Sequence, residues 1–176
     1  MRRAIAVVAP NALPAAEIVA AVTLAYHDRY RRRVRMTDDD GNAFLLDLPQ
    51  ATVLRDGDGL ALDGGGYLLT RAAAESVADI FCPSPDMTAR IAWHIGNRHV
   101  PVQVLSGGAL RILDDHVLVE MVRGLGARVV LCRAPFAPES GAYAGGGHHH
   151  GHDHDHGHDH DHDHGPAHGH GAGHGR

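Results

Sequence analysis

Short apolar runs separated by turn sequences fill the first half of the chain and predict β structure. The Arg-rich segment Tyr30–Met36, the Asp- and Gly-rich turn Thr37–Asn42 and the apolar run Ala43–Leu48 follow one another as in a β-hairpin. The same order recurs at Leu60–Leu62, Asp63–Gly66 and Tyr67–Thr70. Two further apolar runs precede the hairpins, at Ala4–Ala9 and Val19–Ala25. Several short strands at this spacing indicate a small β-sandwich or barrel.

The second half changes to a helical period. Met87, Ile91 and Ile95 lie four residues apart, which predicts a helix capped by Asp86 and running to about Arg98. A second helix carries apolar residues at Val117, Met121 and Leu125, with Asp114 or Asp115 as its cap and Gly126 as its stop. Strands are expected at Val77–Cys82, Val100–Leu105, Ala109–Leu113 and Arg128–Arg133. The resulting βαββαβ order is the ferredoxin-like pattern.

These patterns predict an α+β protein of three parts. Residues 1–73 form a β-rich domain and residues 74–144 a ferredoxin-like domain. Residues 145–176 contain 13 His, 10 Gly and 5 Asp among 32 residues. Such a segment has almost no apolar surface to bury, so we expect a disordered tail.

Charge and cysteine content exclude several classes of protein. All 16 basic residues are Arg. Residues 1–144 contain 15 Arg and 16 acidic residues, a net charge of −1, and the tail has a net charge of −4. This balance argues against nucleic-acid binding. No apolar run approaches the roughly 18–20 residues of a membrane span, and Ala4–Ala9 is too short for a signal peptide. We therefore expect a cytoplasmic protein, with Cys82 and Cys132 buried in strands as inert thiols.

The tail is the strongest chemical signal in the sequence. Its imidazoles begin at His148, His149, His150, His152, His154 and His156 and continue in alternation with Asp and Gly. Neutral imidazole suits Ni²⁺, Zn²⁺ and Cu²⁺, and no thiol lies nearby to favour Cu(I). The alternation is unlike the plain His run of a purification tag, and it predicts a tail that binds many divalent ions with fast exchange.

Four histidines lie outside the tail. His99 follows Gly96-Asn97-Arg98, where the helix must stop, so its imidazole should project from a turn and could serve as a metal ligand. A single histidine cannot build a metal site and would need donors from a second copy or from the tail. His116, beside two aspartates, is either a second ligand or a residue of the helix cap. For His27 and His94 we expect surface or packing roles.

The remaining motifs concern catalysis and the arginine-rich strand. No catalytic triad, Cys/His pair, His-Glu-x-x-His helix or phosphate-binding Gly loop is present, so an enzyme, including a zinc hydrolase, is unsupported. Alternation along a strand places Arg31, Arg33 and Arg35 on one face. That face is either a solvated surface or a docking site for an acidic, carboxylate-rich partner.

Several segments of the chain together form the pattern of a known family. In the second half these are Ala89–Val104 (ARIAWHIGNRHVPVQV), Leu110–Ile112, Asp115–Leu118, Pro135-Phe136 and Gly141–Tyr143, followed by the His-rich end. In the first half they are the Arg cluster, Asp47–Pro49 and Leu54–Asp58. With these segments the chain resembles the UreE family of urease accessory proteins, which act as nickel metallochaperones.

The resemblance implies a small all-β domain, similar to a peptide-binding domain of chaperones, and a ferredoxin-like metal-binding domain through which two copies form a homodimer. It implies that His99 of both copies binds one Ni²⁺ at the interface, with tail histidines completing the ligand set. It further implies delivery of Ni²⁺ to the urease apoprotein, together with the accessory GTPase UreG and the other accessory proteins. The alternative is a general nickel or zinc storage or detoxification protein.

Overall fold

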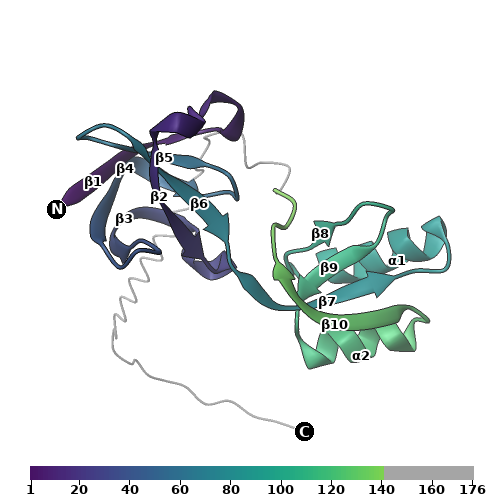
Figure 1. Cartoon of the computed structure of the whole chain (residues 1–176). Helices are drawn as coiled ribbons and strands as arrows, with labels where there is room; N and C mark the ends of the chain where they lie inside the picture. Colours follow the sequence, from purple (N-terminus) through teal and green to yellow (C-terminus); the bar gives the residue numbers. More distant parts are fainter. Residues whose placement is uncertain (141–176) are drawn as a thin grey trace, which may run out of the picture. The chain divides into compact units, whose positions relative to one another are not determined.

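A computed structural model of the chain describes residues 1–140 (Figure 1). The tail expected to be disordered, residues 145–176, lies outside the described residues. Two compact architectures follow one another along the described chain, an all-β half and an α+β half, as the sequence predicts. No helix in the described part of the chain has the length and apolar character needed to cross a bilayer.

The first half is one six-stranded mixed sheet. Its strands are β1 (Arg2–Val8), β2 (Ile18–Leu24), β3 (Tyr30–Thr37), β4 (Ala43–Val53), β5 (Gly59–Leu62) and β6 (Tyr67–Ala72). They lie in the order β2-β6-β5-β1-β4-β3, and both predicted hairpins, β3–β4 and β5–β6, are present. Hydrogen bonds connect all six strands in this one order.

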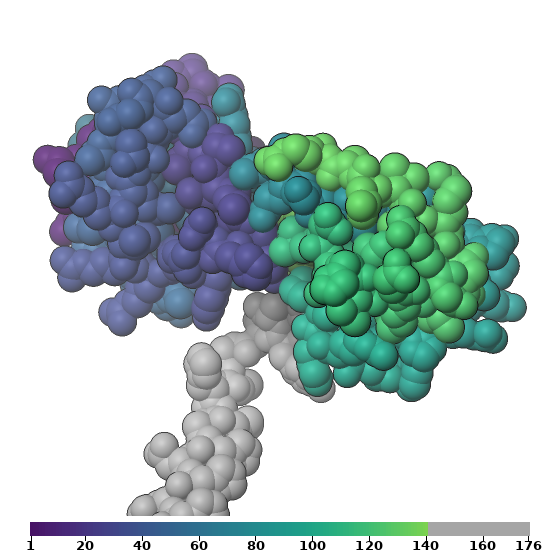
Figure 2. All heavy atoms as spheres, turned by 90° about the horizontal axis from the view of Figure 1, so that it is seen from below, coloured from purple at the N-terminus to yellow at the C-terminus, as the bar shows by residue number. Residues whose placement is uncertain are grey.

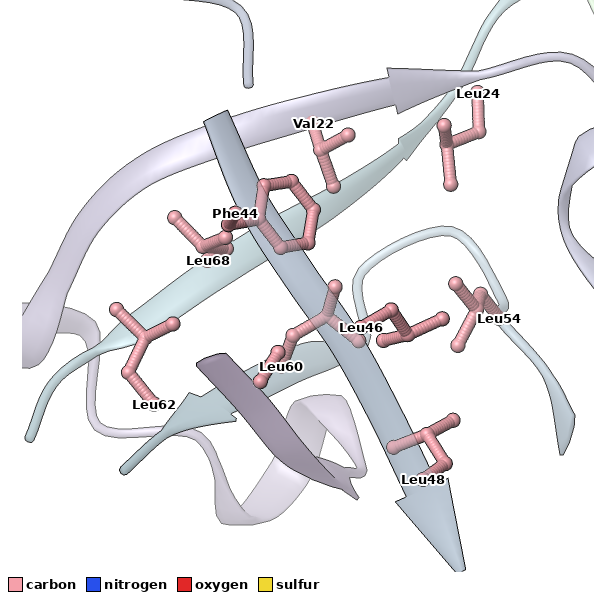
Figure 3. Packing of buried hydrophobic residues seen from close by; sticks show 10 residues of the cluster. Val22, Leu24, Phe44, Leu46, Leu48, Leu54, Leu60, Leu62 and Leu68 are labelled. Carbon is pink, nitrogen blue, oxygen red and sulfur yellow. The ribbon is translucent and has the colours of Figure 1, made fainter. Parts of the chain in front are cut away.

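Two strand pairs in this sheet are parallel, β1 with β4 and β2 with β6, and no turn signal in the sequence predicts either pair. They bring together strands that are far apart in the chain. The inward side chains of five strands form one apolar core, in which Phe44, Leu46 and Leu60 are fully buried (Figure 3). Burial of this apolar surface supplies the main stabilisation of the half.

The second half has the predicted βαββαβ order. It comprises β7 (Ala74–Phe81), α1 (Pro85–Gly96), β8 (Gln103–Val104), β9 (Leu110–Leu113), α2 (His116–Gly124) and β10 (Arg128–Pro135). The sheet order is β10-β7-β9-β8 with every pair antiparallel, which is the ferredoxin-like arrangement. Ile91 and Ile95 of α1 and Val122 of α2 are buried in one core with the sheet, so both helices cover the same face.

Local expectations were wrong at several places. Ser84, not Asp86, caps α1: its hydroxyl accepts a hydrogen bond from the Met87 amide at 3.3 Å, because Pro85 occupies the first helical position. The β8 strand has only two residues instead of six. Both cysteines are half-buried rather than buried, and Cys82 follows β7 instead of lying within a strand.

The α2 cap is resolved by the structure in favour of Asp115. Its carboxylate accepts hydrogen bonds from the amides of Val117 at 2.9 Å and Leu118 at 3.1 Å. These amides are among the helical N–H groups that have no partner within the helix, so Asp115 satisfies them. Gly126, with a φ of +97°, follows the end of α2 as predicted.

Candidate metal site

His99 lies in the turn that ends α1, as the sequence predicts. The helix stops at Gly96 with Asn97 as its C-cap, and the His99 amide donates to the Gly96 carbonyl at 2.9 Å. The Val100 amide then donates to the Ile95 carbonyl at 3.5 Å. These bonds use carbonyls that the helix end leaves without partners, and they fix the backbone of the turn.

The backbone of His99 adopts a conformation that favours glycine. Its φ is +55°, and it is the only non-glycine residue with a positive φ in residues 1–140. The left-handed region costs an L-residue roughly 1–2 kcal/mol, and helices commonly use Gly at such a position. The side chain is exposed, so packing within the chain does not compensate for this cost. An unfavourable backbone conformation at an exposed histidine points to a functional requirement for the imidazole.

The described part of one chain does not supply a complete ligand set around His99. Within residues 1–140, no group of three or more His, Cys, Asp or Glu side chains is placed to hold a metal ion. Transition-metal sites in proteins take about four or more ligands. His99 can therefore contribute to a metal site only with donors from elsewhere, as its isolation in the sequence suggested.

The face of α1 that precedes this turn carries an exposed tryptophan. Trp93 is 62% exposed, whereas Ile91 and Ile95 on the opposite side of the helix are fully buried. Its ring contacts His94 edge-on, with centroids 5.0 Å apart. We did not predict this surface, although the apolar period through Met87, Ile91 and Ile95 already places Trp93 on the outer face.

His116 is the first residue of α2, and it is exposed. The neighbouring Asp115 carboxylate is engaged as the helix cap, so it is not a free ligand beside the imidazole. Asp114 is exposed as well, and its backbone amide donates to Ser76. The structure thus leaves both readings of His116 open, and does not gather it with His99 into a three-donor cluster within the described residues. The tail candidates His148, His149, His150, His152, His154 and His156 lie outside the described residues.

Comparisons with known proteins cover both halves of the chain. Residues 5–73 match the family model of the UreE urease accessory protein N-terminal domain, and residues 75–174 match that of its C-terminal domain. A urease accessory protein UreE from Bradyrhizobium sp. (strain ORS 278) is 50% identical over 129 residues, which cover 73% of this chain and 61% of that relative. A UreE from Beijerinckia indica is 47% identical over 137 residues, covering 78% and 77%. The chain thus spans about three fifths of the length of the Bradyrhizobium relative.

Proposed function

Because the chain belongs to the UreE urease accessory protein family, we propose that it binds Ni²⁺ and delivers it to apo-urease while the urease metal centre is assembled. A member of this accessory protein family is not an enzyme, in line with the sequence, which offers no catalytic constellation. The observation that carries the proposal is His99: an exposed imidazole held at a positive φ, which belongs to no cluster of three or more potential ligands within residues 1–140.

The missing donors come from a second copy of the chain in this proposal. Two molecules join through the outer face of α1, so that Trp93 becomes covered and the two His99 side chains meet on one Ni²⁺. The exposure of Trp93 supports this arrangement, because a large exposed aromatic side chain is typical of an interaction surface. Because such a shared site has few protein ligands, coordination positions on Ni²⁺ stay open. A protein that transfers its metal to another protein requires such open positions.

The tail serves as the reservoir in this proposal. Its 13 histidines offer many interchangeable weak ligands, so Ni²⁺ is captured at high capacity and released readily. His148, His149, His150, His152, His154 and His156, which come first in the tail, are the candidates to complete coordination at His99. The partners of the transfer are the accessory GTPase UreG and the urease apoprotein with its other accessory proteins, in the cytoplasm.

Calorimetric titration with Ni²⁺ tests the proposal, with light scattering to give the oligomeric state. We expect the full chain to show one tight site per dimer and many weak sites. His99→Ala should remove the tight site and leave most of the weak sites. Trp93→Ala should yield monomers that lack the tight site. His27→Ala is the matched control, because its imidazole is exposed like that of His99 and lies in the first half of the chain. A tight site that survives His99→Ala would refute the assignment of that residue.

The abundance of tail histidines favours one alternative, a nickel or zinc storage or detoxification protein. Storage requires capacity and no partner, whereas delivery requires a docking surface for UreG or apo-urease. Ni²⁺-dependent complex formation with UreG, measured by light scattering on the mixed proteins, separates the two. Failure to form any such complex, together with an unchanged tight site in His99→Ala, would favour storage.

A further inference from the structure

We propose that the open edge of β3 binds an extended segment of a partner protein in which acidic residues alternate with apolar ones. This inference does not depend on nickel binding. It starts from the position of β3 at the end of its sheet, where it pairs with β4 alone among the described strands. An edge strand presents a row of backbone N–H and C=O groups that another strand can pair with.

The two faces of β3 differ in chemistry beside this edge. Val34 and Met36 point inward and pack against the core of the first half while remaining partly exposed. Arg33 and Arg35 alternate with them and are exposed on the outward face. Pairing with β4 is regular from Arg33 to Thr37, after an irregular register between Arg31 and Arg33. A strand added here would place every second side chain beside the arginines and the others beside Val34 and Met36.

On the outward face beside β3, the arginine side chains outnumber the carboxylates that pair with them. Asp47 of β4 lies between two arginines, with ion-pair distances of 3.5 Å to Arg33 and 3.6 Å to Arg3 of β1. Arg35 lies next to Leu45 of β4 in the register and is exposed. Each guanidinium has five N–H donors and can bind a carboxylate through two of them. Acidic side chains of an added strand would therefore find unused donors on Arg33 and Arg35.

The same observations favour a protein over a nucleic acid. Residues 1–144 have a net charge of −1, so no broad positive field attracts a phosphate backbone. Asp47 lies within the basic face and would repel phosphates. An apolar inward row at Val34 and Met36 suits alternate apolar side chains of a strand.

Figure 2 shows that the violet and blue residues, a range that includes β3 and β4, form much of the visible surface of the first half.

Fluorescence anisotropy on the metal-free full chain tests the proposal. The probe is a fluorescein-labelled peptide of four Glu-Val repeats, and the control peptide has four Glu followed by four Val, with the same charge and composition. We expect the alternating peptide to bind more tightly. The double variant Arg33→Gln/Arg35→Gln should weaken binding about two- to thirtyfold, the range given by two exposed ion pairs. The matched control, Arg71→Gln/Arg90→Gln, removes the same charge from exposed positions elsewhere and should change little.

Backbone methylation of the peptide tests strand pairing separately from charge. The N–H groups of alternate residues point to the same edge of a strand. Methylating the Glu amides or the Val amides should therefore abolish binding in one case and preserve it in the other. Equal effects of both methylations, equal binding of the block peptide, or equal losses in both double variants would overturn the proposal. Tighter binding of oligo-dT, or no binding of the alternating peptide, would overturn it too; in the latter case the arginines only protect the edge from pairing.

Discussion

His99→Gly separates the cost of the backbone conformation from the function of the imidazole. A non-glycine residue at a positive φ costs roughly 1–2 kcal/mol, and glycine avoids this cost. Glycine loses about 0.5–1 kcal/mol more conformational free energy on folding than alanine does. The exposed side chain adds no packing term to the comparison. We therefore expect the metal-free His99→Gly protein to unfold with a free energy about 0.5–1 kcal/mol higher than that of His99→Ala.

Urea denaturation of the metal-free proteins measures this difference in the free energy of unfolding. Protein concentration is held fixed and a chelator is present, because dimer formation and bound metal both shift the apparent stability. A second series of measurements is made without chelator. Addition of Ni²⁺ at about 100 times its dissociation constant should stabilise the wild type by about 2.7 kcal/mol through the tight site. Ni²⁺ binding to the tail should change the free energy of unfolding of all three proteins equally. The two variants, which lack the tight site, should therefore be stabilised by Ni²⁺ less than the wild type. If His99→Gly proved less stable than His99→Ala, the argument from the positive φ of +55° would fail. If His99→Gly kept the full nickel response, the functional requirement for the imidazole would be refuted.

Three further predictions concern the cap of α2, an acid-sensitive ion pair and the tail. Asp115→Ala should lower the free energy of unfolding by about 1 kcal/mol through loss of the cap, whereas Asp114→Ala should change it little in the same urea assay. The hydrogen bond from Arg2 holds the pKa of the Asp38 carboxyl below its usual value, so Asp38 stabilises the fold above its unfolded-state pKa. The stability difference between wild type and Asp38→Asn should therefore be present at neutral pH and vanish as the pH falls through the lowered pKa. Truncation after Tyr143 should remove most nickel capacity in calorimetry and leave a dimer with about one ion per pair; loss of the dimer would contradict this.

Local sequence signals predicted most of the elements that depend on near neighbours. The β3–β4 and β5–β6 hairpins follow from their turns, and the end of α1 before His99 follows from Gly96 and Asn97. The cap of α1 was missed because Ser84 and Asp86 both have capping side chains. Only the geometry of the helix start decides between them, since the cap must precede Pro85 with an extended backbone.

Sequence patterns were sufficient to predict the α+β class and the order of the elements, and they show a tail rich in imidazole side chains. These depend on apolar period, turn residues and side-chain type, all of which are local properties. The tertiary structure alone decided the parallel pairs β1–β4 and β2–β6, and with them the position of β3 at an open edge. It also decided that His99 takes a positive φ. Contacts between distant segments carry no signal in any short window of sequence, because they form only when burial of a common core brings those segments together.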